Sequence, residues 1–217
     1  MKEGASGDDE LAAIRSLYDR AAARYAAIDG GRLSRWLLLK KRQQAAGYAR
    51  GHLLEVGIGA GVTLALYPAE VRVTGIDVSP GMLAIARRRL SELGRDGDLH
   101  EMDAQRLDFD DHEFDSVAFN LCLCTIPDPA RALREAIRVA KPGAPMTFLE
   151  HVRSDRPWVA ILQDLLNALF SRGIHDRINA RTEDVIRAAG IEIQSVDRWA
   201  LGLMTLIVGH APQGRDR

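Results

Sequence analysis

The stretch that decides the fold is HLLEVGIGAGVTLALYPAEVRVTGIDVSP, residues His52–Pro80. An apolar run leads into three glycines at every second position, Gly57, Gly59 and Gly61, and a second apolar run ends at Asp77. Two short buried strands joined through a glycine-rich turn are typical of a parallel sheet, and ligands enter such sheets at the carboxyl ends of the strands. The turn after the first strand is therefore the first candidate binding loop.

Outward from this stretch, strand-like and helix-like segments alternate. Ser79 and Asp128 are expected helix caps, each followed by proline, and Gly94 is an expected helix end. Helices are expected over residues 61–68, 79–94, 128–144, 157–170 and 181–190, and strands over 52–57, 71–78, 98–104, 114–123, 145–152, 191–199 and 201–210. This pattern predicts an α/β protein with one doubly wound, mostly parallel, seven-stranded Rossmann-like sheet, closed by an antiparallel hairpin that turns near residues 200–202.

The segment before the sheet reads as helical. ELAAIRSLYDRAAARYAAI, residues 10–28, has apolar residues at three- and four-residue spacing, and Asp29-Gly30-Gly31 separates it from a second helix. We expect residues 10–50 to form a helical extension or lid on a domain spanning 51–210. Residues 1–9 and 211–217 are expected to be disordered.

Composition narrows the class of protein. The 217 residues carry a net charge of −1, which gives no overall drive toward nucleic acid. Cys122 and Cys124 are expected to share one face of the fourth strand, as core residues and not as a disulfide or zinc site. No apolar run has the length of a signal core or membrane span, so we expect a cytoplasmic protein without a metal.

The residues around the glycine loop indicate what it binds. Asp77 follows Gly57 by twenty residues, the offset at which a carboxylate accepts hydrogen bonds from ribose hydroxyls. The third glycine comes one residue too early for the dinucleotide pattern, and Glu55 would repel a pyrophosphate. Glu55 suits a cation such as an ammonium or sulfonium, and no lysine follows the glycines to make a phosphate-binding loop.

These residues resemble the class I S-adenosylmethionine-dependent methyltransferases, with motifs in the same order over roughly Leu53–Val208. The resemblance implies that S-adenosylmethionine is the cofactor and S-adenosylhomocysteine the product. It also implies a set of cofactor-binding residues: Glu55, Gly57, Gly59, Gly61, Asp77, Val78, Met82, Asp103, Ala104 and Asn120. In the family, the positions of Glu55, the three glycines and Asn120 lie near the methionine portion of the cofactor, and that of Asp77 lies at the ribose. The remaining positions lie near the adenine.

The first helix carries a further resemblance. LYDRAAARYAAI is similar to the YDxxAxxYD lead helix of quinone-type C-methyltransferases, in which an aromatic residue closes over the cofactor. Tyr18 or Tyr25 would fill that role. Packing of both rings between the helix and the sheet explains the same residues without a ligand.

Three segments bear on the methyl acceptor. Asn120 is followed by Leu121-Cys122 and not by the proline-proline-aromatic sequence of many adenine or amide N-methyltransferases, which argues against DNA, RNA or protein-glutamine substrates. LCLCTIPDPARAL, FLEHVRS and GIHD resemble the small-molecule branch that holds ubiquinone/menaquinone C-methyltransferases, thiol methyltransferases and phosphatidylethanolamine N-methyltransferases. His151 and His175 become the candidate catalytic bases, or else structural caps. Ile174 departs from the cysteine that is usual in the thiol enzymes.

Two apolar helices raise the question of a membrane surface. The helix over 157–170 is apolar around much of its circumference, and Trp36 and Leu37–Leu39 lie among basic residues. Peripheral membrane contact and a lid over the pocket both explain the second pattern, and the lid is favoured. The expected function is transfer of a methyl group to a small-molecule or lipid acceptor that is partly apolar. The alternatives are a nicotinamide-dependent oxidoreductase and a non-catalytic cofactor-binding partner protein.

Overall fold

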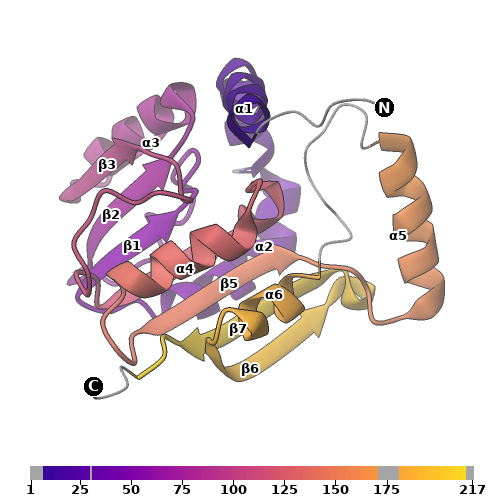
Figure 1. The fold of residues 1–217 in the computed structure, drawn as a ribbon. Helices are drawn as coiled ribbons and strands as arrows, with labels where there is room; N and C mark the ends of the chain where they lie inside the picture. Colours follow the sequence, from indigo (N-terminus) through magenta and orange to yellow (C-terminus); the bar gives the residue numbers. More distant parts are fainter. Residues whose placement is uncertain (1–6, 30, 171–180, 214–217) are drawn as a thin grey trace.

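The computed structural model describes residues 7–29, 31–170 and 181–213, and Figure 1 shows how their helices and strands are arranged. The helices are α1 (Gly7–Asp29), α2 (Arg32–Ala46), α3 (Pro80–Glu92), α4 (Pro129–Val139), α5 (Pro157–Phe170) and α6 (Thr182–Ala188), with short 3₁₀ turns η1 (Leu123–Thr125) and η2 (Ala200–Gly202). The strands are β1 (His52–Val56), β2 (Arg72–Asp77), β3 (Gly97–Glu101), β4 (Ser116–Asn120), β5 (Pro145–His151), β6 (Glu192–Trp199) and β7 (Met204–His210).

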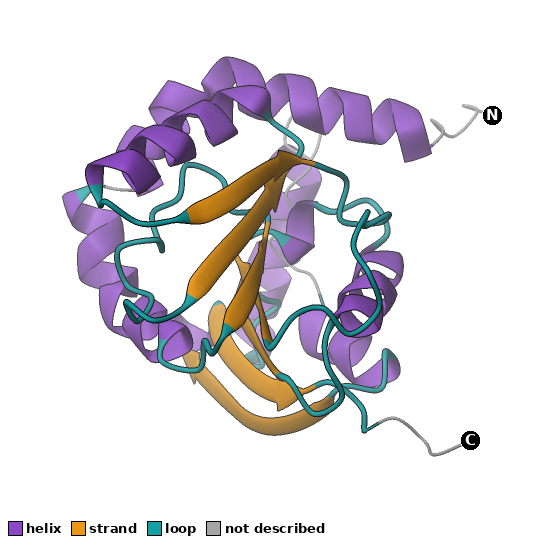
Figure 2. Cartoon of the chain, turned by 90° about the vertical axis from the view of Figure 1, so that its left-hand side faces the viewer, coloured by secondary structure: helices purple, strands orange, loops and turns teal. Residues whose placement is uncertain are grey.

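The seven strands form one sheet in the order β3-β2-β1-β4-β5-β7-β6. Strands β1 to β5 run parallel, and β7 runs antiparallel to both β5 and β6. The order reverses at β1 and β4, which lie side by side at the centre. Figure 2 shows the twisted sheet surrounded by helices. The predicted α/β class, the mostly parallel sheet and the C-terminal hairpin are confirmed.

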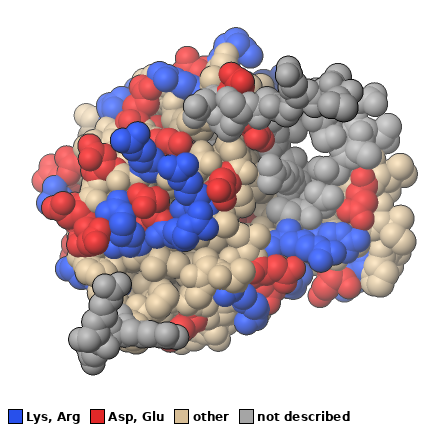
Figure 3. Space-filling view, viewed as in Figure 1, with Lys and Arg blue, Asp and Glu red and all other residues tan. Residues whose placement is uncertain are grey.

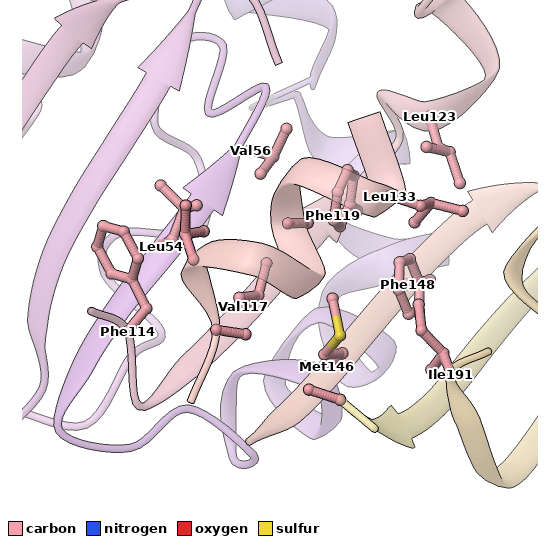
Figure 4. Packing of buried hydrophobic residues seen from close by; sticks show 14 of the residues in the cluster. Leu54, Val56, Phe114, Val117, Phe119, Leu123, Leu133, Met146, Phe148 and Ile191 are labelled. Carbon is pink, nitrogen blue, oxygen red and sulfur yellow. The ribbon is translucent and has the colours of Figure 1, made fainter. Parts of the chain in front are cut away.

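Alternation along the strands sends side chains to two covered faces. Leu54 and Val56 of β1 belong to the larger core cluster, which also includes residues of α4 and α6 (Figure 4). Leu53, one residue out of phase, packs instead with Leu83 and Leu90 of α3 and with the end of α2. Because side chains alternate with a period of two, Glu55 and Asn120 share the face of Leu53, and so does His151 by its register through β4 and β5. This phase brings three polar side chains from three strands toward one side.

The two N-terminal helices occupy different places. Ala22 and Ala26 of α1 pack with Ala60 of the glycine loop and Met82 of α3. The end of α2 packs on the sheet itself, where Ala45 meets residues of β5 and β7. Helix α1 thus covers the glycine loop and the start of α3, while the end of α2 forms part of the cover of one sheet face.

One predicted helix is wrong. Residues 61–70 form successive turns instead of the helix expected over 61–68. The guanidinium of Arg95, in the loop after α3, donates to the carbonyl oxygens of Leu64, Tyr67, Pro68 and Val71 at 3.2, 2.6, 2.6 and 3.1 Å. Pro68 has no N–H for the carbonyl of Leu64, so a helix could not pair that oxygen, and one side chain from outside the segment bonds it together with three later carbonyls.

Several further boundaries differ from expectation, among them the end of α4 at Val139 and of β3 at Glu101. Gly7–Asp9 belong to α1 and are not a disordered end. Ala211 is buried and pairs with Ala144, so the expected disordered tail does not begin there. The fourth strand ends at Asn120, since Leu121 has a φ of +59° that a strand cannot continue through. Cys122 and Cys124 therefore follow the strand and are not on it, although both are buried free thiols as expected.

In the part of the chain that the structure describes, no helix combines the length and apolar character needed to span a bilayer.

Candidate active site

A cavity of about 360 Å³ opens where β1, β2 and β4 end. Its walls come from the glycine loop, from the ends of these strands, and from α1 and α2. Twelve of the fourteen residues expected in the site line it, namely Tyr18, Tyr25, Glu55, Gly57, Gly59, Asp77, Val78, Met82, Asp103, Ala104, Asn120 and His151. Residues 171–180 lie outside the described residues, and with them the predicted His175. The remaining residue, Gly61, does not line this cavity.

The three glycines of the loop have three different surroundings. All have positive φ, from +54° to +72°. A Cβ on Gly57 would lie 2.5 Å from the Cβ of Cys122, and one on Gly61 would lie 3.3 Å from the Cα of Ala86 on α3. A Cβ on Gly59 would have no described atom within 4 Å. Gly57 and Gly61 thus permit close packing of the chain, whereas the space beside Gly59 is open to the cavity.

Asp77, at the end of β2, is held in place by backbone groups. Its carboxylate accepts hydrogen bonds from the amide N–H of Gly59 and of Ser79, each at 2.9 Å. Burial raises the pKa of Asp77 above its ordinary value, and these two bonds oppose the rise. The carboxylate therefore joins the glycine loop to the start of α3 and still lines the cavity.

Glu55 and Asn120 form the buried polar centre of the site. The amide nitrogen of Asn120 donates to Oε1 of Glu55 at 2.8 Å and to the hydroxyl of Tyr67 at 3.4 Å. Burial raises the pKa of Glu55 to about 7, although hydrogen bonds from Asn120, Tyr67 and Thr63 and the charge of Arg42 act in the opposite direction.

Two oxygen atoms of this centre lack a hydrogen-bond partner among the described residues. They are Oε2 of Glu55 and Oδ1 of Asn120, and both residues line the cavity. Buried acceptors without partners are costly, so a donor brought by a ligand would be favoured here. A positively charged donor fits best, because it would also stabilise the ionised form of Glu55.

The loop after β4 is fixed by the neighbouring strand. Oε1 of the buried Glu150 accepts from the amide N–H of Cys122 and of Leu123, at 3.1 and 3.0 Å. This contact lies on the opposite sheet face from His151, the next residue of β5. The thiol of Cys122 donates to the carbonyl of Val56, and burial holds its pKa well above the ordinary value, which leaves it a poor nucleophile.

The far end of the cavity is less polar. The carboxylate of Asp103 accepts from the backbone and side-chain N–H groups of Gln105 at 2.9 to 3.1 Å. The rings of Tyr18 and Tyr25 have centroids 5.1 Å apart. Both tyrosines pack against the cluster between α1 and α3, and both also line the cavity.

Several lining residues were missed by sequence reasoning. Leu11, Ile14 and Ile28 of α1 and Leu38 and Arg42 of α2 complete the wall. The apolar spacing of α1 predicted a buried stripe but not what it covers. No local sequence pattern predicted that Arg42 would line the cavity, because Arg42 comes close to Glu55 only when α2 packs on the sheet.

Comparison with known proteins gives the site a family. Residues 54–148 match a family model described as "Methyltransferase domain". The chain is 38% identical over 130 residues to phosphatidylethanolamine N-methyltransferase of Cereibacter sphaeroides, a match covering 58% of this chain and 64% of that one. The chain thus spans less than two thirds of that relative.

A second relative is matched over most of its length, and the fold recurs in solved structures. Demethylmenaquinone methyltransferase of Clavibacter sepedonicus is 28% identical over 222 residues, 93% of this chain and 89% of that one. Geranyl diphosphate C-methyltransferase from Streptomyces coelicolor, solved with S-adenosyl-L-homocysteine, superposes with a TM-score of 0.65 at 15% identity, over 80% and 79% of the two chains. Motif order, sheet order and these matches agree that this chain belongs to the class I S-adenosylmethionine-dependent methyltransferases.

Proposed function

We propose that this protein transfers the methyl group of S-adenosylmethionine to a small, partly apolar acceptor. The observation that carries the proposal is the pair of buried acceptor atoms without a hydrogen-bond partner on Glu55 and Asn120, two residues that line the same cavity as Asp77. A cofactor with an ammonium group at one end and ribose hydroxyls in its middle supplies donors for both positions.

In this arrangement each polar residue has one task. Glu55 and Asn120 accept from the ammonium, and Asp77 accepts from the ribose hydroxyls while its bond to Gly59 keeps the loop in place. The open space beside Gly59 admits the cofactor close to the backbone. Gly57 acts indirectly, by letting the loop approach Cys122.

The other end of the cavity suits the adenine. Val78 and Met82 offer apolar contact to the ring, Ala104 leaves room for it, and Asp103 is placed to accept from the exocyclic amino group. Tyr18, with Tyr25, would cover the cofactor from α1. Neither tyrosine is a candidate for the chemical step.

When bound, S-adenosylmethionine supplies an electrophilic methyl group, so the chain's own work is alignment, exclusion of water and proton transfer. His151 lines the cavity at the end of β5 and is the residue placed to accept a proton from a thiol, phenol or ammonium acceptor. His175 is proposed as a second such group.

The apolar part of the cavity lining indicates the acceptor. Leu11, Ile14 and Leu38 present branched aliphatic side chains to the cavity, and Ile126 and Pro127 present apolar surface from the loop after β4. An acceptor with an apolar body and one nucleophilic atom fits this lining, such as a lipid amine, a thiol, or a phenol or quinone. The two relatives named above act, by their names, on a phospholipid amine and on a menaquinone precursor.

The experiment is a thermal-shift comparison of S-adenosylhomocysteine with NAD, followed by methyl-transfer assays on thiols, phenols, amines and lipids. A ligand that binds only the folded state raises the melting temperature. We expect a rise with S-adenosylhomocysteine alone. A rise with NAD alone would favour an oxidoreductase, and cofactor binding without transfer to any acceptor class would favour a non-catalytic module.

We further propose peripheral contact between α5 and a membrane surface facing the cytoplasm, which would give access to a lipid acceptor. Trp158, Ile161, Leu162 and Leu165 recur on one helical face and are 49–67% exposed. This helix lies at the edge of the molecule, where uncharged surface is drawn at the right of Figure 3. The side chains of Trp36 and Leu37 lie outside the described residues, and Leu38 faces the cavity, which supports the lid explanation for α2.

Vesicle co-sedimentation at physiological salt tests this contact. We expect the protein to pellet with phospholipid vesicles and the double variant Trp158→Ser/Ile161→Ser to stay in the supernatant. Leu93→Ser is the matched control, because Leu93 is an exposed apolar residue after α3, away from α5. Equal pelleting of all three proteins, or of none, would contradict the proposal.

A further inference from the structure

Asp19 of α1 reaches across to the first turn of α3. Its Oδ1 accepts a hydrogen bond from the amide N–H of Gly81 at 2.6 Å and from the hydroxyl of Ser79 at 3.3 Å. Ser79 is already the N-cap of α3, because its Oγ accepts from the amide of Met82 at 3.1 Å. The start of α3 is therefore capped twice, once by its own residue and once by a carboxylate from another helix.

The contact of Asp19 with Ser79 and Gly81, which we call the joint, depends on the glycine at position 81. A Cβ at Gly81 would lie 2.7 Å from Oδ1 of Asp19 and 3.2 Å from its backbone oxygen. The φ of Gly81 is not in the left-handed region, so the conformation alone would accept another residue. It is the close approach of α1 that leaves no room for a side chain.

The joint continues into the cofactor site. The amide of Ser79 donates to Oδ1 of Asp77 at 2.9 Å, and Oδ2 of Asp77 accepts from the amide of Gly59 at 2.9 Å. Asp19, Ser79, Asp77 and Gly59 thus form one connected path from α1 to the glycine loop. Tyr18, the neighbour of Asp19 in sequence, lines the cavity.

The other contacts of α1 are less directional. Its alanines pack on Ala60 and Met82, and Arg15 pairs with Glu101 where both side chains are about half exposed, at 51% and 43%. Asp19 is exposed as well, but its carboxylate accepts from a backbone N–H at a helix start, and such a bond fixes position and angle more closely than an ion pair between two long side chains.

We propose that Asp19 is a positioning residue that holds α1, and with it Tyr18 and Tyr25, closed over the bound cofactor. This inference rests on the proposed function, since it assigns to Asp19 the retention of that cofactor. Asp19 takes no part in methyl transfer itself. Loss of the joint lowers the closed fraction, and the apparent Kd rises in proportion to that loss.

Isothermal titration with S-adenosylhomocysteine tests the joint. We expect Asp19→Ala to raise Kd about tenfold, which is about 1.4 kcal/mol, with a matching rise in the dissociation rate. Asp19→Asn keeps an oxygen acceptor, so we expect Kd within about threefold of the parent protein. Arg15→Ala is the matched control on the same helix and should leave Kd unchanged. In a transfer assay Asp19→Ala should raise KM for S-adenosylmethionine and spare kcat at saturation.

A second variant approaches the joint from the other side. Gly81→Ala should weaken cofactor binding as Asp19→Ala does, because its methyl group displaces Oδ1 of Asp19 while every residue of α1 stays unchanged in sequence. Because both changes open the same joint, Asp19→Ala/Gly81→Ala should bind no more weakly than the weaker single variant. The melting temperature of each variant identifies one that folds poorly, and the Kd of the other single variant then decides. Parent-like Kd for both single variants would overturn the proposal. Absence of S-adenosylhomocysteine binding by the parent protein would overturn the proposed function instead.

Discussion

The side chain of Asn120 donates to Oε1 of Glu55 at 2.8 Å, joining the end of β4 to the end of β1 beneath the glycine loop. The bond engages Nδ2 of Asn120 and Oε1 of Glu55, and it leaves the buried atoms Oε2 of Glu55 and Oδ1 of Asn120 without a hydrogen-bond partner among the described residues. One bonded pair thus holds two unpartnered acceptors, and the pKa of Glu55 near 7 makes the charge of its carboxyl group sensitive to pH around neutrality.

The stability of the ligand-free protein should depend on Glu55 in a defined direction. The folded pKa of about 7 lies above the ordinary 4.5, so between these values the folded protein holds a proton that the unfolded chain has released. The free energy of unfolding therefore falls as pH rises through this window, by about 3 kcal/mol. Urea titrations at several pH values measure it. Glu55→Gln should flatten this part of the profile, and an equally steep fall in that variant would contradict the assignment.

Ligand binding should show the opposite trend. A cationic donor favours ionised Glu55, so the affinity for S-adenosylhomocysteine should improve as pH rises toward 7, with release of a proton. Calorimetry in two buffers of different ionisation enthalpy counts that proton. Glu55→Gln should bind about tenfold more weakly at pH 8, since it loses a charge-assisted hydrogen bond, and should release no proton.

Gly57 and Gly59 should respond differently to alanine. Gly59→Ala meets no described atom, so it should fold with only the cost of a positive φ, about 1–2 kcal/mol, and lose cofactor binding because the methyl group occupies the open space. Gly57→Ala would place its Cβ against Cys122 and should lose considerably more stability. Melting temperature and S-adenosylhomocysteine affinity separate the two effects. Parent-like affinity in Gly59→Ala would show that the cofactor lies elsewhere.

His151→Ala should lower kcat and leave the Kd of S-adenosylhomocysteine unchanged. The reason is that His151 lines the cavity from β5, whereas the residues proposed to hold the cofactor, Glu55 and Asn120, come from β1 and β4. For an acceptor that must lose a proton, the loss should be about 100-fold or more, and the acidic limb of the rate profile should disappear. His100→Ala, on exposed β3, is the control. Unchanged turnover in His151→Ala would make that histidine structural.

Glu150→Ala should destabilise the fold by about 2–4 kcal/mol, because it removes the acceptor for two buried backbone N–H groups. Glu150→Gln retains one acceptor oxygen and should cost less. Denaturant unfolding ranks the two variants. A larger cost for Gln than for Ala would mean that the loop after β4 is not held in this way.

Much of this fold follows from local pattern, because caps and strand alternation are local. Ser79 and Asp128 cap α3 and α4 through their own side chains, and Gly94 ends α3 with a positive φ. The site residues on strand ends could be named for the same reason: Glu55, Asp77 and Asn120 each stand at the end of a buried run. A residue at a strand's end needs only the sheet topology to be placed.

The features that local sequence pattern did not predict depend on contacts between residues that are distant in sequence. The apolar run GVTLALYP has the composition of a helix, yet Gly61 and Pro68 leave it short, and the carbonyl oxygens near its end are bonded by the distant Arg95. Gly61 sits in the motif but serves packing against Ala86, which no spacing rule could show. The roles of Arg42 and Asp19 likewise appear only when helices meet.

Arg95 also has a consequence for the order in which the chain assembles. It lies 31 residues after Leu64, beyond β2 and α3, and bonds four carbonyl oxygens of the connection between β1 and β2. The connection gains these bonds only when the end of α3 is in place. In a nascent chain that ends before residue 95 they would be missing, so we expect the segment between β1 and β2 to be less protected against local unfolding than in the full chain.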